Sequence, residues 1–118
     1  MTGSEIAHLI SRHKYVFDNE DELQLGIAAV LERAGVEAER EVKINATDRL
    51  DFLAGSIAIE IKIAGSRPQI LTQLHRYAQS ERVSEIVLVS LKARHHGLPF
   101  ELNGKRIHMA SLLGGSFA

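Results

Sequence analysis

Two charged residues near the middle of the chain have the spacing of a catalytic pair on a β-strand. Glu60 and Lys62 lie two residues apart in the apolar segment 57–63, and side chains two residues apart in a strand project from the same face. Isoleucines occupy the alternate positions of this segment, which predicts that the opposite face is buried in a core. The segment therefore presents a carboxylate and an ammonium side by side on a sheet.

Asp51, in the preceding extended segment, is a second carboxylate that could join Glu60. If the hairpin turn consists of residues 54–55, strand pairing places Asp51 opposite Ala58, on the face of Glu60 and one diagonal step away. A three-residue turn would reverse that relation. Two carboxylates around one cation form an oxygen site suited to Mg²⁺ or Mn²⁺. Such an ion polarises a phosphoryl oxygen and lowers the pKa of a bound water, and a neighbouring Lys62 can orient that water, so the arrangement best serves phosphodiester hydrolysis.

Two expected helices could add side chains to this site. Segment 20–34 has apolar residues at helical spacing, and Glu20 lies roughly 40° from the centre of their stripe, so it points toward the sheet. A second helix is expected to start at Ser66 and run to about residue 82, with Gln73 and Tyr77 four residues apart on one edge of its buried stripe. Burial of that edge would require partners for both polar tips.

The order of the expected elements predicts an α/β fold with a small mixed β-sheet flanked by helices. A further helix pattern covers residues 4–14, and strand patterns cover residues 38–45, 49–53, 56–63 and 86–89. The last strand is a continuous apolar run after a helix, which indicates burial on both faces and a parallel neighbour. Local signals add capping boxes at Asn19 with Glu22 and at Ser66 with Gln69, and a turn at Asn103-Gly104.

Composition and charge limit the class of protein. The chain has 118 residues, 45% of them hydrophobic and 25% charged, which fits a single globular domain over residues 1–118. The absence of cysteine excludes disulfide frameworks, thiolate nucleophiles and cysteine-bound metal clusters. A net charge of −1 means that a polyanion would have to be bound by a local basic patch. Charges interrupt the apolar residues of segment 1–14, so we expect a soluble, cytoplasmic protein without a signal peptide or membrane span.

Taken together, the candidate residues resemble the PD-(D/E)XK nuclease superfamily. The resemblance covers about residues 20–90 and rests on Glu20, Asp51, the triplet Glu60-Ile61-Lys62, and the helix motif Gln73-Leu74-His75-Arg76-Tyr77. The order of helix, hairpin, helix and strand matches as well. One departure is Leu50, which stands where the family pattern has proline before the aspartate. The small size looks most like stand-alone virus-type nuclease domains and Holliday-junction resolvases.

The resemblance implies a fold, a cofactor and a role for each residue. The fold is a restriction-endonuclease-like core, and Asp51 and Glu60 bind Mg²⁺ or Mn²⁺. The Ile61 carbonyl is a further ligand and Glu20 an outer or second-metal ligand. Lys62 assists the attacking water, and Gln73 and Tyr77 line the site. The implied activity is hydrolysis of DNA in repair, recombination or phage DNA processing.

Partners follow from the same interpretation. We expect phosphate contacts from four basic residues, namely Arg67, Arg76, Lys92 and Arg94. Specific DNA interfaces commonly bury ~1,000 Å² or more. A chain this small is therefore expected to act as a homodimer or higher oligomer, or with a partner protein.

The same residues have other interpretations. Glu60 and Lys62 could form an ordinary ion pair on a solvated strand face, and Glu20 could be a first-turn acid that favours the helix dipole. Gln73 and Tyr77 could simply border the core. The alternatives for function are a non-catalytic nucleic-acid or protein-binding module of the same fold, and an RNase with the same site.

Overall fold

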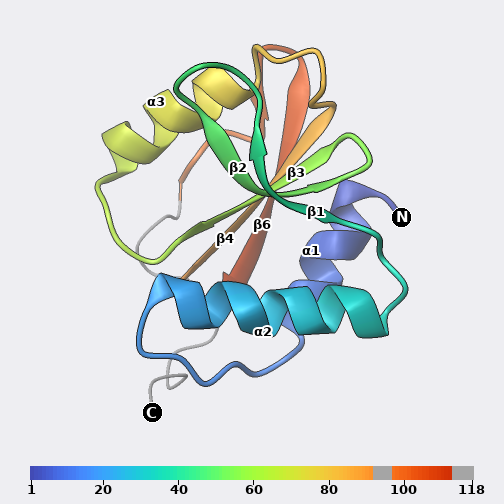
Figure 1. The fold of residues 1–118 in the computed structure, drawn as a ribbon. Helices are drawn as coiled ribbons and strands as arrows, with labels where there is room; N and C mark the ends of the chain where they lie inside the picture. The colour runs from blue at the N-terminus through green and yellow to red at the C-terminus, as the bar shows by residue number, and fades with distance from the viewer. Residues whose placement is uncertain (92–96, 113–118) are drawn as a thin grey trace.

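A six-stranded mixed sheet with helices on both faces organises residues 1–91 and 97–112, the part of the chain that the computed structural model describes (Figure 1). Along the chain the elements are α1 (Gly3–Ser11), α2 (Glu20–Arg33), β1 (Glu39–Lys43), β2 (Arg49–Ala54), β3 (Ile57–Lys62), α3 (Arg67–Tyr77), β4 (Glu85–Leu91), β5 (Glu101–Leu102) and β6 (Lys105–Leu112). The strand order is β1-β2-β3-β4-β6-β5. The first three strands are antiparallel neighbours, β4 is parallel to β3 and β6, and β5 is antiparallel to β6. The prediction of an α/β fold with a small mixed sheet flanked by helices is confirmed.

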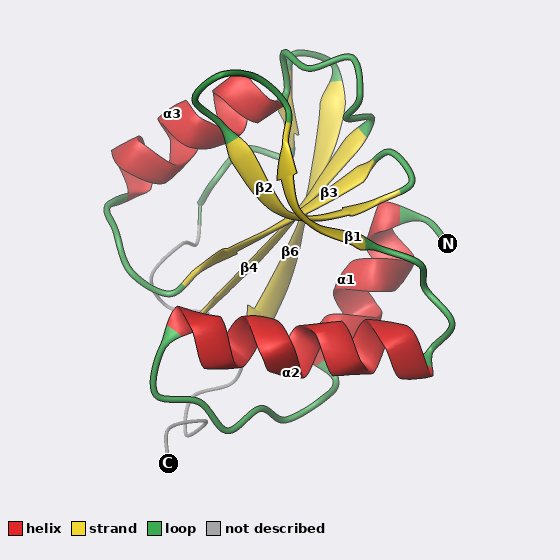
Figure 2. Cartoon of the chain, viewed as in Figure 1, coloured by secondary structure: helices red, strands yellow, loops and turns green. Residues whose placement is uncertain are grey.

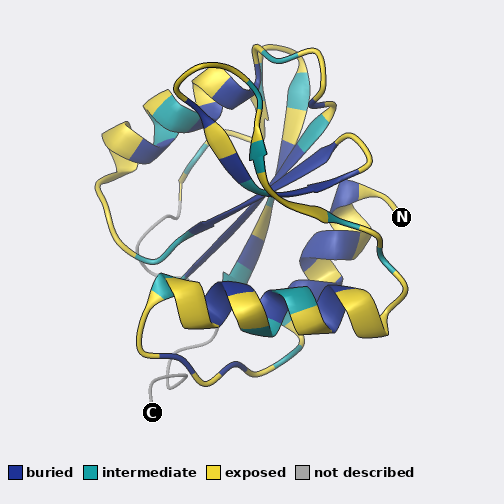
Figure 3. Cartoon of the chain, viewed as in Figure 1, coloured by how far each residue is buried: buried dark blue, intermediate teal, exposed yellow. Residues whose placement is uncertain are grey.

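Side-chain alternation along β3 separates two core layers, one on each face of the sheet. Figure 2 shows the helices that cover the sheet, with α3 apart from α1 and α2. The isoleucines of β3 pack with α1 and α2, whereas Ala58 packs with Leu74 and its neighbours on α3. Glu60 and Lys62 have the parity of Ala58, so they lie on the α3 face. The central strands β3 and β4 are buried along most of their length, as Figure 3 shows. Glu60 and Lys62 therefore project from an otherwise apolar face of the sheet.

Side chains cap the N-termini of the helices that flank the site. The Asn19 side chain accepts a hydrogen bond from the Glu22 N–H (2.9 Å), but the Glu22 carboxylate accepts from the Asp18 N–H (2.6 Å) instead of completing the predicted box. At α3 the predicted box is complete, since Ser66 and Gln69 each accept a bond from the other's backbone N–H. Within residues 1–91 and 97–112, no helix has the length and apolar character needed to cross a membrane.

The helix α3 ends at Tyr77, so the predicted extension to about residue 82 is wrong. Past the helix, the backbone N–H groups of residues 79–80 donate to carbonyls three residues earlier, which tightens the chain into a turn. The turn brings the Ser84 N–H to the Ser56 carbonyl (2.7 Å), where β4 begins alongside β3. Docking of the next strand, and not local helix propensity, therefore sets the length of α3.

The β2–β3 hairpin turns one residue later than the sequence-based interpretation assumed. Ala54 pairs with Ile57, so the turn residues are Gly55-Ser56 and not residues 54–55. Gly55 has φ of 63°, a left-handed conformation that glycine adopts without strain. This shift of one residue changes the strand partner of every residue in β2.

Candidate active site

The position of the turn brings Asp51 and Glu60 face to face. Phe52 pairs with Ile59, and Leu53 with Ala58, so the same register places Asp51 across from Glu60. The predicted position of Asp51 opposite Ala58 is therefore wrong. Because the turn lies one residue later, the strand partner of Asp51 is two residues further along β3. The structure thus places the two carboxylates closer together than the diagonal arrangement inferred from sequence.

Side-chain hydrogen bonds replace the strand ladder next to this pair. The Ile61 N–H donates to Asp51 Oδ2 (2.8 Å), and the Asp51 N–H donates to Glu60 Oε1 (3.2 Å). Because the N–H and C=O groups of one strand residue point to the same side, the Ile61 carbonyl also faces β2. Backbone groups therefore orient both carboxylates, and the Ile61 carbonyl is directed toward the strand that carries Asp51.

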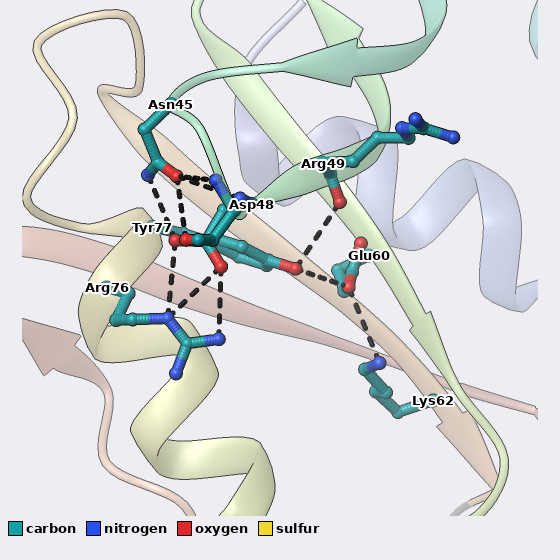
Figure 4. Close-up of polar contacts among 8 residues, drawn as sticks. Asn45, Asp48, Arg49, Glu60, Lys62, Arg76 and Tyr77 are labelled. Carbon is teal, nitrogen blue, oxygen red and sulfur yellow. Dashed lines mark hydrogen bonds and ion pairs between the residues drawn. The ribbon is translucent and has the colours of Figure 1, made fainter.

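Glu60 is almost completely buried, with 2% of its surface exposed. Its Oε2 accepts a hydrogen bond from Tyr77 Oη (2.9 Å) and lies 3.6 Å from Lys62 Nζ (Figure 4). Tyr77 Oη also lies 3.4 Å from the Arg49 carbonyl. Tyr77, Glu60 and Lys62 thus form one polar chain that links α3 to β3.

The electrostatics of the two carboxyl groups favour retention of a proton. Burial, followed by the charge of Asp51, raises the pKa of Glu60 to about 8, against the opposing effects of Lys62 and the Tyr77 hydrogen bond. Burial also raises the pKa of Asp51, although its hydrogen bonds with Ile61 N–H and the Glu60 carboxyl lower it. At neutral pH Glu60 is therefore largely protonated.

Tyr77 is a neutral hydrogen-bond donor across the physiological range. Burial and the negative charge of Glu60 both raise the pKa of its phenol. Its ring is fully buried in the core layer between α3 and the sheet. The phenol therefore stays protonated and keeps the Glu60 carboxylate in a fixed orientation.

Glu20, the first residue of α2, lies at the periphery of this group. Burial and, to a lesser extent, the negative charge of Asp51 raise the pKa of Glu20. The positive charge of Lys62 and a hydrogen bond from the Ile63 backbone lower it. These interactions place its carboxylate within electrostatic range of the site. The prediction that Glu20 points toward the sheet agrees with its half-buried position.

The donor set of this group fits a hard divalent cation such as Mg²⁺ or Mn²⁺. Asp51 and Glu60 lie across from each other on neighbouring strands, and each carboxylate accepts a hydrogen bond from a backbone N–H of the opposite strand. Their oxygens and the Ile61 carbonyl are the ligand types that such ions accept. Among the described residues, no three or more His, Asp or Glu side chains are grouped to hold a metal ion. The fitting set therefore consists of two carboxylates and a carbonyl, with Glu20 outside it.

Arg67 and Gln73, two of the residues that the sequence suggested, are not part of this network. Gln73 is half-buried on α3, and its side chain makes no hydrogen bond to another residue within the described ranges. Arg67 is exposed at the first position of α3, with its guanidinium next to Gly97. Lys92 and Arg94 lie outside the described residues.

Arg76 contacts a residue that the sequence analysis missed. Arg76 Nε lies 3.1 and 3.2 Å from the two carboxylate oxygens of Asp48, and Arg76 Nη2 lies 3.0 Å from Oδ1. This bonding lowers the pKa of Asp48, which is only 4% exposed. The spacing of Asn45 and Asp48 between two strand patterns is typical of a turn closed by an asparagine side chain, and it could have identified the residue.

Comparisons with known proteins do not assign a family. A scan against protein-family models, a search of curated proteins and a search of solved structures each found no match to this chain. What the protein does must therefore be inferred from the residues of the site itself.

Proposed function

We propose that this protein is a metal-dependent nuclease that hydrolyses phosphodiester bonds in DNA. The observation that carries the proposal is the convergence of Asp51 and Glu60 beside Lys62, whose Nζ lies 3.6 Å from Glu60. Mg²⁺ or Mn²⁺ held by these carboxylates and the Ile61 carbonyl supplies a Lewis acid and lowers the pKa of a bound water. Paired carboxylates next to an ammonium serve this reaction better than a purely structural role, because burial of such charges is unfavourable.

Each side chain has a role that follows from its surroundings. The Lys62 side chain is 25% exposed, so its ammonium can contact a substrate phosphate, orient the attacking water and stabilise the charge that develops. Tyr77 fixes Glu60 through the bond to Oε2. Glu20 acts from the periphery through its charge, as an outer ligand or the ligand of a second ion.

DNA is the proposed substrate because the residues of the site resemble those of the PD-(D/E)XK nucleases. Arg67, one of the basic residues predicted to contact phosphate, is exposed at the start of α3, and we propose it as a phosphate contact. A duplex interface of ~1,000 Å² or more is large for one copy of this chain. We therefore propose that a homodimer or higher oligomer, or a complex with a partner protein, grips the DNA.

A cleavage assay tests the proposal directly. Linear duplex, single strand, flap and four-way junction DNA would be incubated with Mg²⁺, Mn²⁺ or EDTA. We expect metal-dependent cutting by the wild type and its loss in Lys62→Ala. Lys43→Ala is the matched control, because Lys43 is an exposed lysine of β1 outside the site, and this variant should cut as the wild type does.

The same assay separates the alternatives. Glu60→Gln should abolish cutting while DNA binding in EDTA persists. A folded wild-type protein that cuts none of these substrates with either metal would refute the nuclease proposal and favour a binding module. Preferential cutting of a matched RNA would keep the metal-dependent chemistry but replace DNA by RNA as the substrate.

A further inference from the structure

The loop between β1 and β2 is folded tightly around Asn45. Asn45 Oδ1 accepts hydrogen bonds from the Thr47 N–H (2.8 Å), the Thr47 hydroxyl (3.1 Å) and the Asp48 N–H (2.8 Å). The Ile44 N–H donates to the Asp48 carbonyl (3.1 Å), which closes the loop. The loop therefore holds the Asp48 carboxylate in one position at the start of β2.

Asp48 and Arg76 form a bridge between this loop and α3 (Figure 4). Two nitrogens of the guanidinium contact the carboxylate at 3.0–3.2 Å, and Asn45 Nδ2 donates to Asp48 Oδ2 (2.9 Å). A buried carboxylate is tolerated only when its charge is paired and hydrogen-bonded, and these bonds meet that requirement. The bridge also pairs the charge of Arg76 with a carboxylate of this chain.

The residues directly after Asp48 and Arg76 contact each other next to Glu60. Arg49 follows Asp48 and offers its carbonyl to Tyr77, which follows Arg76 and donates to Glu60. The bridge thus fixes the distance between the start of β2 and the end of α3 at the point where the tyrosine contacts the carboxylate. Asp51 lies only three residues beyond Asp48, within β2.

We propose that the Asp48–Arg76 bridge is a positioning device that holds Tyr77 against Glu60, and that Arg76 is not a phosphate contact. This inference rests on the proposed nuclease function and gives Arg76 a different role from the phosphate contact that the sequence suggested. The geometry of three bonds to one buried carboxylate supports it. Partners of metal-ligating carboxylates commonly change activity by about 10–100-fold when removed, so the bridge should affect turnover more than substrate binding.

Kinetics and DNA binding distinguish the two roles of Arg76. We expect Asp48→Asn and Arg76→Ala to lower kcat by about tenfold or more, with KM within about twofold of the wild type. The dependence of DNA affinity on salt, measured in EDTA, should not change. Arg67→Ala is the matched control, and removal of this exposed arginine should reduce the salt slope by about 0.9. If Arg76→Ala gives that reduced slope with kcat unchanged, Arg76 is a phosphate contact and the inference is wrong.

Tyr77→Phe tests the bridge without disturbing Asp48. This variant should lower kcat as the bridge variants do. The double variant Asp48→Asn/Tyr77→Phe should have a kcat no lower than that of the slower single variant, because both changes break the same chain of contacts. A kcat that falls multiplicatively in the double variant would overturn the inference.

A double-mutant cycle in stability keeps the test independent of catalysis. If the wild type cuts no nucleic acid, the proposed function fails, and the unfolding constants of Asp48→Asn, Tyr77→Phe and their combination decide on the bridge. A deviation from multiplicative behaviour of about threefold or more supports coupling between the bridge and the tyrosine. Multiplicative effects would overturn it.

Discussion

Replacement of Glu60 by glutamine should remove a pH-dependent loss of stability, so that the variant gains on the wild type as the pH rises. Glu60 has its pKa raised from 4.5 to about 8 by burial and by Asp51. Between these values the folded state binds the proton more tightly than the unfolded state does. The stability that protonation supplies is therefore fully present below pH 4.5 and is lost as the pH rises through 8.

The size of the effect follows from the two pKa values. One pKa unit corresponds to about 1.4 kcal/mol, so the wild type should lose roughly 3 kcal/mol of unfolding free energy through Glu60 between pH 5 and pH 8. Glutamine has the shape of the protonated acid and cannot ionise, so Glu60→Gln avoids this loss. Its carbonyl can accept the Tyr77 hydrogen bond, whereas its NH2 group replaces the oxygen that accepts from the Asp51 N–H, so this second bond is lost at every pH. The gap in unfolding free energy between variant and wild type should therefore open as the pH rises.

Urea denaturation in EDTA at pH 5 and pH 8 measures the gap. A difference of roughly 3 kcal/mol shifts the urea midpoint by about 1–3 M, because urea slopes of small proteins are about 1–3 kcal/mol/M. Glu81→Gln, at an exposed glutamate outside the site, is the control and should follow the wild type at both pH values. A gap that does not change with pH would show that Glu60 ionises normally, and would refute the argument from burial.

Two further predictions concern the metal and the core. At pH 8, Mg²⁺ or Mn²⁺ at tenfold excess over its dissociation constant should raise the unfolding free energy of the wild type by about 1.4 kcal/mol. The increase should be much smaller for Glu60→Gln. Equal increases in both proteins would show that the ion binds elsewhere. Ser90→Ala should stabilise the protein by about 1 kcal/mol, because the Ser90 hydroxyl is fully buried and has no hydrogen-bond partner among the described residues. A lower urea midpoint would contradict this.

Local patterns were sufficient to locate the strand that carries the site. The period-two alternation of β3 placed Glu60 and Lys62 on one face and the isoleucines on the other, and the structure shows both layers. Helix starts at Asn19 and Ser66 were also evident, because a cap is a contact over three residues. These features depend on residues close in sequence.

Features that depend on distant residues were not predictable in the same way. A turn at residues 54–55 and one at Gly55-Ser56 fit the local sequence equally well, and only the full β2–β3 register decides between them. The partner of Arg76 lies 28 residues away in another loop, so the helix pattern alone made it look free for phosphate. The end of α3 was misjudged because the Ser84 N–H bonds to Ser56 in the neighbouring hairpin.

The burial that makes Glu60 unfavourable when ionised is also the property that suits it to the proposed chemistry. A carboxylate removed from water interacts more strongly with a cation, because less solvent screens the two charges. Apolar layers keep the Glu60 carboxylate away from water at a cost in stability. Tyr77 lies on one side of it, and the isoleucines of β3 lie on the opposite face of the sheet. Sites that combine strained electrostatics with a rigid apolar support commonly exchange stability for activity. If Glu60 binds a cation, removal of its charge should therefore both raise stability and abolish cleavage. If the carboxylate has only a structural role, its removal should change stability alone.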